Sequence, residues 1–459
     1  MEGIAAVLGV GAVVWGAVVL CRGGLVAGCL AVLLAGCCFG YPFYHLPTRP
    51  IPLALDRALW LVLLAQYAVW RKLGWAAPKP VATADLVLGL FFAALGLSTL
   101  THDWRAHNAM AVSRLAFFYV MPLGVYWAAR QSRVSERTVL GLLVCLTVFG
   151  VYLALTAFAE VADVRGLVFP PYIMSPEYPE FLGRARGPLL SPIGNGILLG
   201  TCLAAGLSLW ARLGRWGRAG MVPVLLMMAG GALLTLTRSV WMGAALGGLL
   251  VVGLAAPAAW RRLILAAALV AAVVLAATQW ERLSSFKRDR AISAQEMAES
   301  ARLRPILATV AWKMFLDRPL WGCGFGQYAD ASREYLADRS TDLPLEKARP
   351  FVQHNVFLAL LTETGLVGMG LFVALLTLWA REAWRLWRSP HAPFGARQAA
   401  LLFLACAANY LVNGMFHDVA IIPMVNMVLF FLAGMTVGLA REAAEVGTPG
   451  RDSKSPITE

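Results

Sequence analysis

The chain has 459 residues, of which 59% are hydrophobic and only 14% are charged, a composition that excludes an ordinary soluble protein. Its 39 Lys and Arg residues outnumber its 26 Asp and Glu residues, which gives a formal net charge of +13. Much of this excess sits in short clusters beside apolar runs, as expected for cytoplasmic loops of membrane proteins, so it does not indicate nucleic-acid binding.

Apolar runs of about 18 to 20 residues recur along nearly the whole chain and predict an all-α, polytopic membrane helix bundle. We expect about 12 transmembrane helices, or 13 if no early segment is re-entrant. The first run has no charged region before it and no small-residue cleavage site, so it is interpreted as a span and not as a signal peptide. The predicted spans cover residues 3–20, 24–40, 53–70, 84–100, 115–129, 138–159, 189–210, 221–236, 239–256, 262–279, 356–380, 398–413 and 419–440.

The basic clusters predict the orientation of these spans. If the clusters are cytoplasmic, the loops from residue 53 onward alternate consistently between the two sides of the membrane, and the C-terminus is cytoplasmic. The clusters are Arg71 and Lys72; Arg130, Arg133 and Arg137; Arg212, Arg215 and Arg218; Arg261 and Arg262; and Arg381, Arg385 and Arg388. The loops that then face outward are 41–52, 101–114, 160–188, 236–239, 280–355 and 414–418.

This topology divides the chain into four parts. Residues 1–279 form an N-terminal transmembrane bundle that includes the outward loop 160–188. Residues 280–355 form a large outward loop, in which the composition of 294–315 predicts one or two amphipathic helices. Residues 356–440 form the C-terminal transmembrane helices. The tail at 441–459 is rich in Gly, Pro, Ser and charge towards its end, which is typical of a disordered cytoplasmic segment.

A polar triplet, Gln353-His354-Asn355, stands at the mouth of the apolar run 356–380. Polar groups at a membrane boundary cost desolvation free energy, so they commonly serve a function. An imidazole with an ordinary pKa near 6.5 accepts a proton from a hydroxyl group at neutral pH. The alternative is an interfacial histidine that is hydrogen-bonded to backbone or water.

Several arginines fall on the outward side, where the positive-inside rule disfavours them. The planar guanidinium group is well suited to phosphate oxygens, and several together would bind a diphosphate. For Arg238 the alternative is snorkelling of its side chain to the interface, and Arg302 and Arg304 could simply face water from a loop helix. The outward arginines considered are Arg184, Arg186, Arg238, Arg302 and Arg304.

Other patterns do not predict a metal or a nucleotide site. Seven of the eight cysteines lie in or beside apolar runs, and no CxxC pair, His-rich tract or Asp-rich motif is present. The pairs His102-Asp103 and His417-Asp418 could bind a metal or relay a proton, but a hydrogen-bonded interfacial pair is the commoner arrangement. For Glu363 we expect a structural role at a helix irregularity. The activity is therefore expected to be metal-independent.

Four segments within residues 180–375 form an ordered set of motifs. They are Arg-Ala-Arg-Gly at 184–187 with Ser-Pro-Ile-Gly-Asn-Gly at 191–196, Leu-Thr-Arg-Ser-Val-Trp at 236–241, residues 314–326, and Gln-His-Asn-Val-Phe-Leu at 353–358 with Glu-Thr-Gly-Leu-Val-Gly at 363–368. Together they resemble the O-antigen ligase and polymerase superfamily, whose polytopic members use undecaprenyl-diphosphate-linked glycans. Thr237 stands where serine is common in the family, and both Arg302 and Arg304 lie where one upstream arginine is usual.

The resemblance implies an inverting glycosyltransferase in the bacterial inner membrane, surrounded by membrane lipids, with its active site facing the periplasm. It implies an undecaprenyl-diphosphate-linked glycan as donor and lipid A-core as acceptor, without any cofactor or nucleic acid. His354 would be the general base, and Arg186 and Arg238 would be catalytic groups on the diphosphate. Further substrate contacts are expected from Arg184, Arg302, Arg304, Gln353 and Asn355.

Related activities remain alternatives. The size of the 280–355 loop and the chain length favour a ligase over an O-antigen or exopolysaccharide polymerase and over a protein O-oligosaccharyltransferase. A flippase or transporter for lipid-linked glycan would also need outward arginines. It would further need polar residues along a path through the membrane, and the spans here are nearly free of charge.

Overall fold

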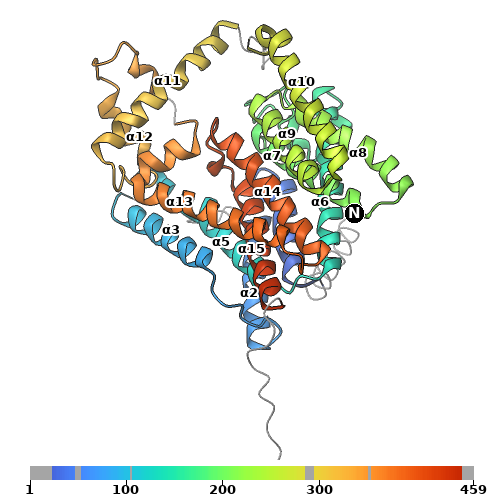
Figure 1. Cartoon of the computed structure of the whole chain (residues 1–459). Helices are drawn as coiled ribbons and strands as arrows, with labels where there is room; N and C mark the ends of the chain where they lie inside the picture. The colour runs from blue at the N-terminus through green and yellow to red at the C-terminus, as the bar shows by residue number, and fades with distance from the viewer. Residues whose placement is uncertain (1–22, 47–52, 104–105, 285–293, 350–352, 447–459) are drawn as a thin grey trace, which may run out of the picture.

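The computed structural model describes residues 23–46, 53–103, 106–284, 294–349 and 353–446. The protein is a helical bundle (Figure 1), and nine helical segments within these residues are long and apolar enough to cross a membrane. They are α3 (Thr83–Leu100), the segment Ala111–Gln131, α6 (Glu136–Val161), α7 (Pro192–Leu209), α8 (Arg215–Leu234), α9 (Arg238–Ala255), α13 (Val356–Arg388), α14 (Phe394–Gly414) and α15 (Pro423–Val446).

The predicted count of 12 or 13 spans is not confirmed. The run 3–20 lies outside the described residues. The run 24–40 corresponds to a shorter apolar helix, Gly23–Cys38. The run 53–70 corresponds to α2 (Leu55–Lys72), whose four charged side chains at its two ends lower its hydropathy. The run 262–279 corresponds to α10 (Ala258–Ser284), which is not among the nine.

The segment Ala111–Gln131 is built from three elements in succession. It begins in α4 (Ala106–Leu115), continues through one π-helical stretch, η1 (Ala116–Val120), and ends in α5 (Met121–Gln131). A short antiparallel sheet, β1 (His45–Leu46) with β2 (Leu53–Ala54), precedes α2. Short 3-10 helices occur at η2 (Arg165–Leu167), η3 (Pro171–Met174), η4 (Trp210–Arg212), η5 (Ser332–Tyr335), η6 (Leu345–Ala348) and η7 (Val419–Ile421).

Helix α15 lies at the centre of the bundle, and 89% of its most apolar window is buried. Two of its glycines allow α5 to approach closely. A Cβ added at Gly434 would lie 2.3 Å from the carbonyl oxygen of Tyr126, and one at Gly438 would lie 2.8 Å from that of Arg130. Close backbone packing of this kind is typical of membrane helix pairs with small residues at the contact.

Helix α13 is broken near its start, at Gly365, whose φ of 62° and ψ of −161° are tolerated essentially by glycine alone. The chain at 319–324 docks into this break. The Leu366 N–H donates to the Pro319 carbonyl at 2.8 Å, and the Cys323 N–H donates to the Thr362 carbonyl at 2.9 Å. The segment therefore supplies hydrogen-bond partners that a broken helix lacks.

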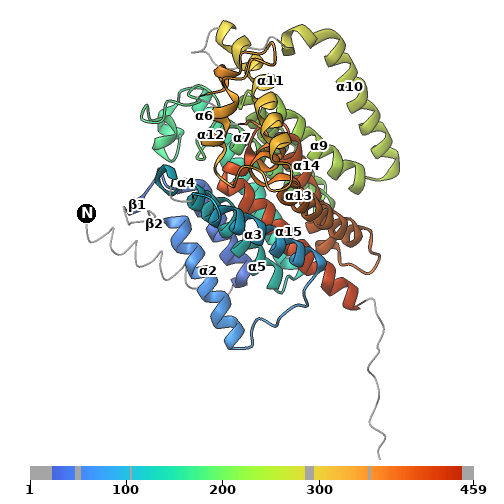
Figure 2. The same cartoon turned by 90° about the vertical axis from the view of Figure 1, so that its left-hand side faces the viewer.

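The segment 280–355, which is predicted to face outward, contains α11 (Ala294–Asp317), which continues through Pro305, and the short helix α12 (Tyr328–Ala331). These elements form a lobe with its own small core. Figures 1 and 2 place this lobe at one end of the molecule, away from the C-terminal end of α15. Members of the lobe core include Ile306, Val310, Met314, Tyr328 and Leu345.

Candidate functional site

The polar triplet immediately precedes α13, and its asparagine is the N-cap residue of that helix. The Asn355 Oδ1 accepts hydrogen bonds from the N–H groups of Phe357, at 2.8 Å, and Leu358, at 3.1 Å. Its Nδ2 donates to the Met415 carbonyl at 2.8 Å. A cap of this kind satisfies N–H groups that have no partner within the helix. Asn355 therefore ties the start of α13 to residues 415–422, the α14–α15 connector.

His354 lies next to this cap, at a cavity of about 150 Å³ that we call the His354 cavity. Its side chain is exposed, and Arg304 from α11 lines the same cavity. Partial burial and the positive charge of Arg304 lower the pKa of His354 below its usual 6.5. The imidazole is therefore neutral at physiological pH, which is the form that accepts a proton.

The other members of the predicted set near His354 differ in accessibility. Gln353 is 2% exposed, and its Nε2 donates to the Thr362 Oγ1 at 3.2 Å, so its amide braces the first turns of α13. Arg304 is exposed. Arg302 belongs to α11, but its side chain lies outside the described residues.

Arg184 connects two of the four sequence segments. Its Nε donates to the Thr235 carbonyl at 3.1 Å, and its Nη2 donates to the Thr237 Oγ1 at 2.6 Å. Thr237 is the N-cap residue of α9, and Arg238 is the first residue of that helix. Arg184, which is only 5% exposed, thus holds the turn that presents Arg238.

Arg238 and His354 approach the same connector. Helices α9 and α14 pack closely, because a Cβ at Gly247 would lie 3.1 Å from the Ala405 carbonyl oxygen and one at Gly243 would contact the Asn409 side chain. The two helices therefore run antiparallel, with residue 247 beside 405 and residue 243 beside 409. This register places Arg238 beside the end of α14, where the connector that lines the His354 cavity begins.

Arg186 is fully buried within the loop 160–188. Its Nε and Nη2 donate to the Ile173 carbonyl, its Nη1 donates to the carbonyls of Tyr178 and Glu180, and its Nε lies 3.7 Å from the Glu160 Oε1. These contacts occupy the guanidinium with partners inside the protein. The geometry thus favours a structural role for Arg186 over the predicted contact with a diphosphate.

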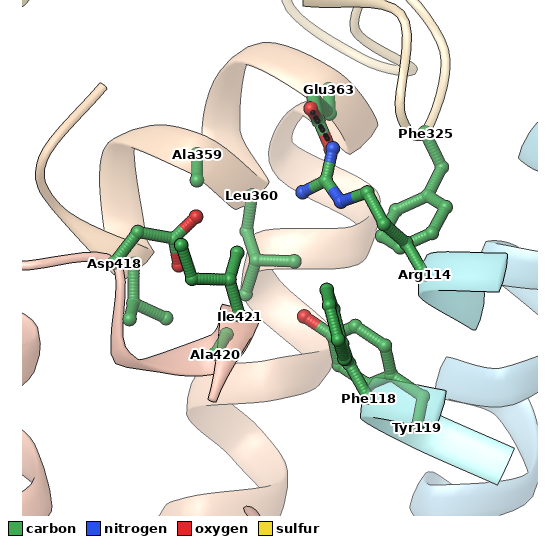
Figure 3. Close-up of a pocket in the computed structure, with 11 residues that line it drawn as sticks. Arg114, Phe118, Tyr119, Phe325, Ala359, Leu360, Glu363, Asp418, Ala420 and Ile421 are labelled. Carbon is green, nitrogen blue, oxygen red and sulfur yellow. Dashed lines mark hydrogen bonds and ion pairs between the residues drawn. The ribbon is translucent and has the colours of Figure 1, made fainter. Parts of the chain in front are cut away.

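An ion pair between a partly buried arginine and a buried glutamate lies at the first turns of α13. The Arg114 Nη1 donates to the Glu363 Oε1 at 2.9 Å, and the Glu363 Oε2 accepts from the Gly326 N–H at 3.1 Å. Figure 3 shows the Arg114 guanidinium directed at Glu363. Glu363 is 2% exposed and joins α4, the docked segment and the break in α13, so its expected structural role agrees with the geometry.

Asp418, Arg114 and Glu363 line one small pocket (Figure 3), which we call the Glu363 pocket. The carboxylate is 9% exposed, and its Oδ1 has no hydrogen-bond partner in the part of the chain that the structure describes. Burial raises the pKa of Asp418 to about 7, although the charge of Arg114 opposes this effect. Burial thus favours the neutral form of the Asp418 carboxyl group.

Sequence reasoning missed Arg114 and Arg57, which both lie near helix ends that the predicted topology places outward. The signal that selected the other arginines, a guanidinium on the outward side of a predicted span, applies equally to these two. Within the described residues, no group of three or more His, Cys, Asp or Glu side chains is arranged to hold a metal ion.

Comparison with known proteins gives a family match over about a third of the chain. Residues 223–373 match the model of the O-antigen ligase family. The matched range includes Arg238, both α11 arginines and His354. No curated protein matches the chain. The match confirms the predicted resemblance and supports the assignment of this multi-pass membrane protein to the O-antigen ligase superfamily.

Proposed function

We propose that the protein is an O-antigen ligase. It transfers a polysaccharide from undecaprenyl diphosphate to a sugar hydroxyl of lipid A-core, on the periplasmic face of the bacterial inner membrane. The family match supports a ligase- or polymerase-type function. The observation that carries the proposal further is His354, neutral and exposed, beside Arg304 at one cavity.

The proposed reaction is a single displacement. The acceptor hydroxyl loses its proton to His354, and its oxygen forms a bond to the anomeric carbon of the donor glycan. The bond from that carbon to the diphosphate breaks at the same time, so the configuration inverts and undecaprenyl diphosphate leaves with the electron pair. The proton on His354 then passes to water. Guanidinium groups at the leaving diphosphate stabilise its developing charge.

The arginines take different roles in this proposal. Arg304 and Arg238 are assigned to the diphosphate because both lie around the His354 cavity or its connector. Arg184 positions Arg238 through Thr237, and Arg186 maintains the loop 160–188. Asn355 and Gln353 position His354 rather than touching the substrate. Arg302 shares the helix of Arg304 and is kept as a second candidate for the diphosphate.

The test is transfer by the purified protein, which is incubated with undecaprenyl-diphosphate-linked glycan and lipid A-core and followed by gel electrophoresis. Glycan on lipid A-core is the expected product, with the same yield in the presence of a chelator. A ladder of longer glycans still on the carrier would instead make the protein a polymerase, the alternative that the family match equally allows.

The His354→Ala variant tests the proposed base. We expect a loss of transfer of at least about a hundredfold, since a general base contributes 10²–10⁴-fold to a rate. The control is His391→Ala, which changes a histidine in the connector between α13 and α14. Both variants should keep the wild-type elution volume in size-exclusion chromatography. Full activity of a folded His354→Ala protein would contradict the assignment.

A further inference from the structure

A second cavity of about 150 Å³ lies at the start of α2 and shares no lining residue with the His354 cavity. We call it the Asp56 cavity. Five separate parts of the chain converge on it: the end of the helix Gly23–Cys38 with the residues after it, α2, the η1–α5 segment, the loop before α7 and the beginning of α15. Its lining includes Tyr41, Asp56, Arg57, Phe117, Leu189 and Met424.

One oxygen of the buried Asp56 carboxylate lacks a hydrogen-bond donor. Asp56 is 8% exposed, and its Oδ1 has no hydrogen-bond partner among the residues that the structure describes. An ionised carboxylate only accepts hydrogen bonds, and a buried acceptor without a donor costs free energy. A ligand that offers hydroxyl groups would satisfy this oxygen, whereas a phosphate would be repelled by it.

The other walls of the cavity provide a positive charge and apolar surface. The Arg57 guanidinium carbon lies 3.9 Å from the centre of the Phe117 ring and 5.9 Å from that of Tyr41, so a positive charge is held at the cavity. The two aromatic rings and the Met424 thioether provide apolar surface. A neutral ring that carries hydroxyls on its edge and C–H groups on its faces fits this combination.

The connector links the three cavities. Met415 and Phe416 line the His354 cavity, Asp418 and Ile421 line the Glu363 pocket, and the next residues, Pro423 and Met424, line the Asp56 cavity. The Glu363 pocket therefore lies between the other two along this stretch of chain. Tyr41 is 44% exposed, so the Asp56 cavity is open at its edge.

We propose that the Asp56 cavity binds one neutral sugar ring of a glycan substrate, with Asp56 accepting hydrogen bonds from its hydroxyls and Arg57 donating to its oxygens. The inference rests on the proposed function, because the ring belongs to the glycan of either the donor or the acceptor. The Asp56 cavity is thereby a specificity subsite separate from the reacting groups at His354.

Direct binding tests the proposal without any need for transfer. The full-length protein in lipid nanodiscs is mixed with methyl glucoside or methyl galactoside, and saturation transfer from protein to sugar is measured by NMR. We expect a signal for wild type that falls at least fivefold in Asp56→Asn and in Leu189→Trp, which fills the cavity. Asp163→Asn, at an exposed aspartate of the loop 160–188, is the matched control and should keep the signal. No wild-type signal, or an unchanged signal in both cavity variants, would overturn the proposal.

Kinetic measurements then show whether the bound sugar ring belongs to the donor glycan or to the acceptor. In the transfer assay, Asp56→Asn should raise the KM of one substrate at least tenfold and change kcat less than twofold. A raised KM for the lipid-linked donor assigns the cavity to the donor glycan, and a raised KM for lipid A-core assigns it to the acceptor. Sugar binding with no transfer by wild type would refute the ligase proposal but leave the cavity assignment standing.

Discussion

The arginines that the predicted topology places outward differ in how deeply each side chain is buried. Arg186 is fully buried among carbonyls and Arg184 is bonded to the turn before α9, whereas Arg304 is exposed at the His354 cavity. A phosphate can bind only a guanidinium that lies at an accessible surface. This contrast is the reason for assigning Arg304 to the diphosphate and Arg186 to the loop architecture.

Substitution of Arg186 should therefore act on stability. Arg186→Gln would leave Glu160 in a buried site without its positive partner, a change that typically costs about 3–5 kcal/mol. We expect a marked drop in Tm, measured on detergent-solubilised protein. Arg165→Gln, at an exposed arginine of the same loop, is the control and should leave Tm nearly unchanged. A wild-type Tm for Arg186→Gln, together with lost donor binding, would restore its role at the diphosphate.

Substitution of Arg304 should act on the pH profile. The charge of Arg304 lowers the pKa of His354, so this pKa should rise in Arg304→Gln. A larger fraction of His354 is then imidazolium at a given pH. The acid limb of the kcat/KM profile should therefore move to higher pH. The maximal rate should also fall roughly a hundredfold through loss of a donor to the leaving group. Arg333→Gln, at an exposed arginine of the same lobe, should change neither. An acid limb that stays in place would show that His354 is not the titrating base.

At the scale of elements, the break in α13 organises the site. The docked segment 319–324 bonds to the broken helix, and Glu363 bonds to both Arg114 and Gly326. These contacts hold the first two turns of α13, which carry the Asn355 cap and His354 at their start. The position of the proposed base thus depends on backbone geometry around Gly365.

The Gly365→Ala substitution tests this dependence. A Cβ at this position would lie 2.3 Å from the Leu320 carbonyl oxygen, and the φ of 62° is itself unfavourable for alanine. We expect a loss of stability of at least about 3 kcal/mol, seen as a lower Tm and a lower yield of folded protein. Gly370→Ala in the same helix meets no atom within 4 Å and is the matched control. Equal Tm values for the two variants would mean that the break is not required.

The sequence predicted part of this arrangement. The apolar periodicity and its polar interruptions were sufficient to predict the helical bundle and the position of His354 at the start of a span. The expected structural role of Glu363 followed from the helix irregularity around it. The pairing of Glu363 with Arg114 could not be predicted, because it joins residues 249 apart in the chain. The burial of Arg186 was equally inaccessible, since its partners are backbone carbonyls, which carry no residue-specific pattern.

At the scale of the whole molecule, the proposed catalytic base and one of the basic clusters lie at opposite ends of α13. His354 precedes its first residue, and Arg381, Arg385 and Arg388 lie in its last turns. The part of α13 after Gly365 has 23 residues (366–388) and is about 35 Å long at 1.5 Å per residue, more than the hydrocarbon thickness of about 30 Å. The two ends of α13 must then lie on opposite sides of the membrane if the helix crosses it.

Protease accessibility in spheroplasts tests this orientation. One protease site is inserted at the exposed Asp342, before α13, and another at the exposed His391, after it. Since the arginine-rich end is expected inside, added protease should cut only the first site in intact spheroplasts and both sites after lysis. Cleavage of the second site alone before lysis would reverse the topology and place His354 in the cytoplasm. The proposed transfer takes place at the periplasmic face, so that result would also contradict the ligase proposal.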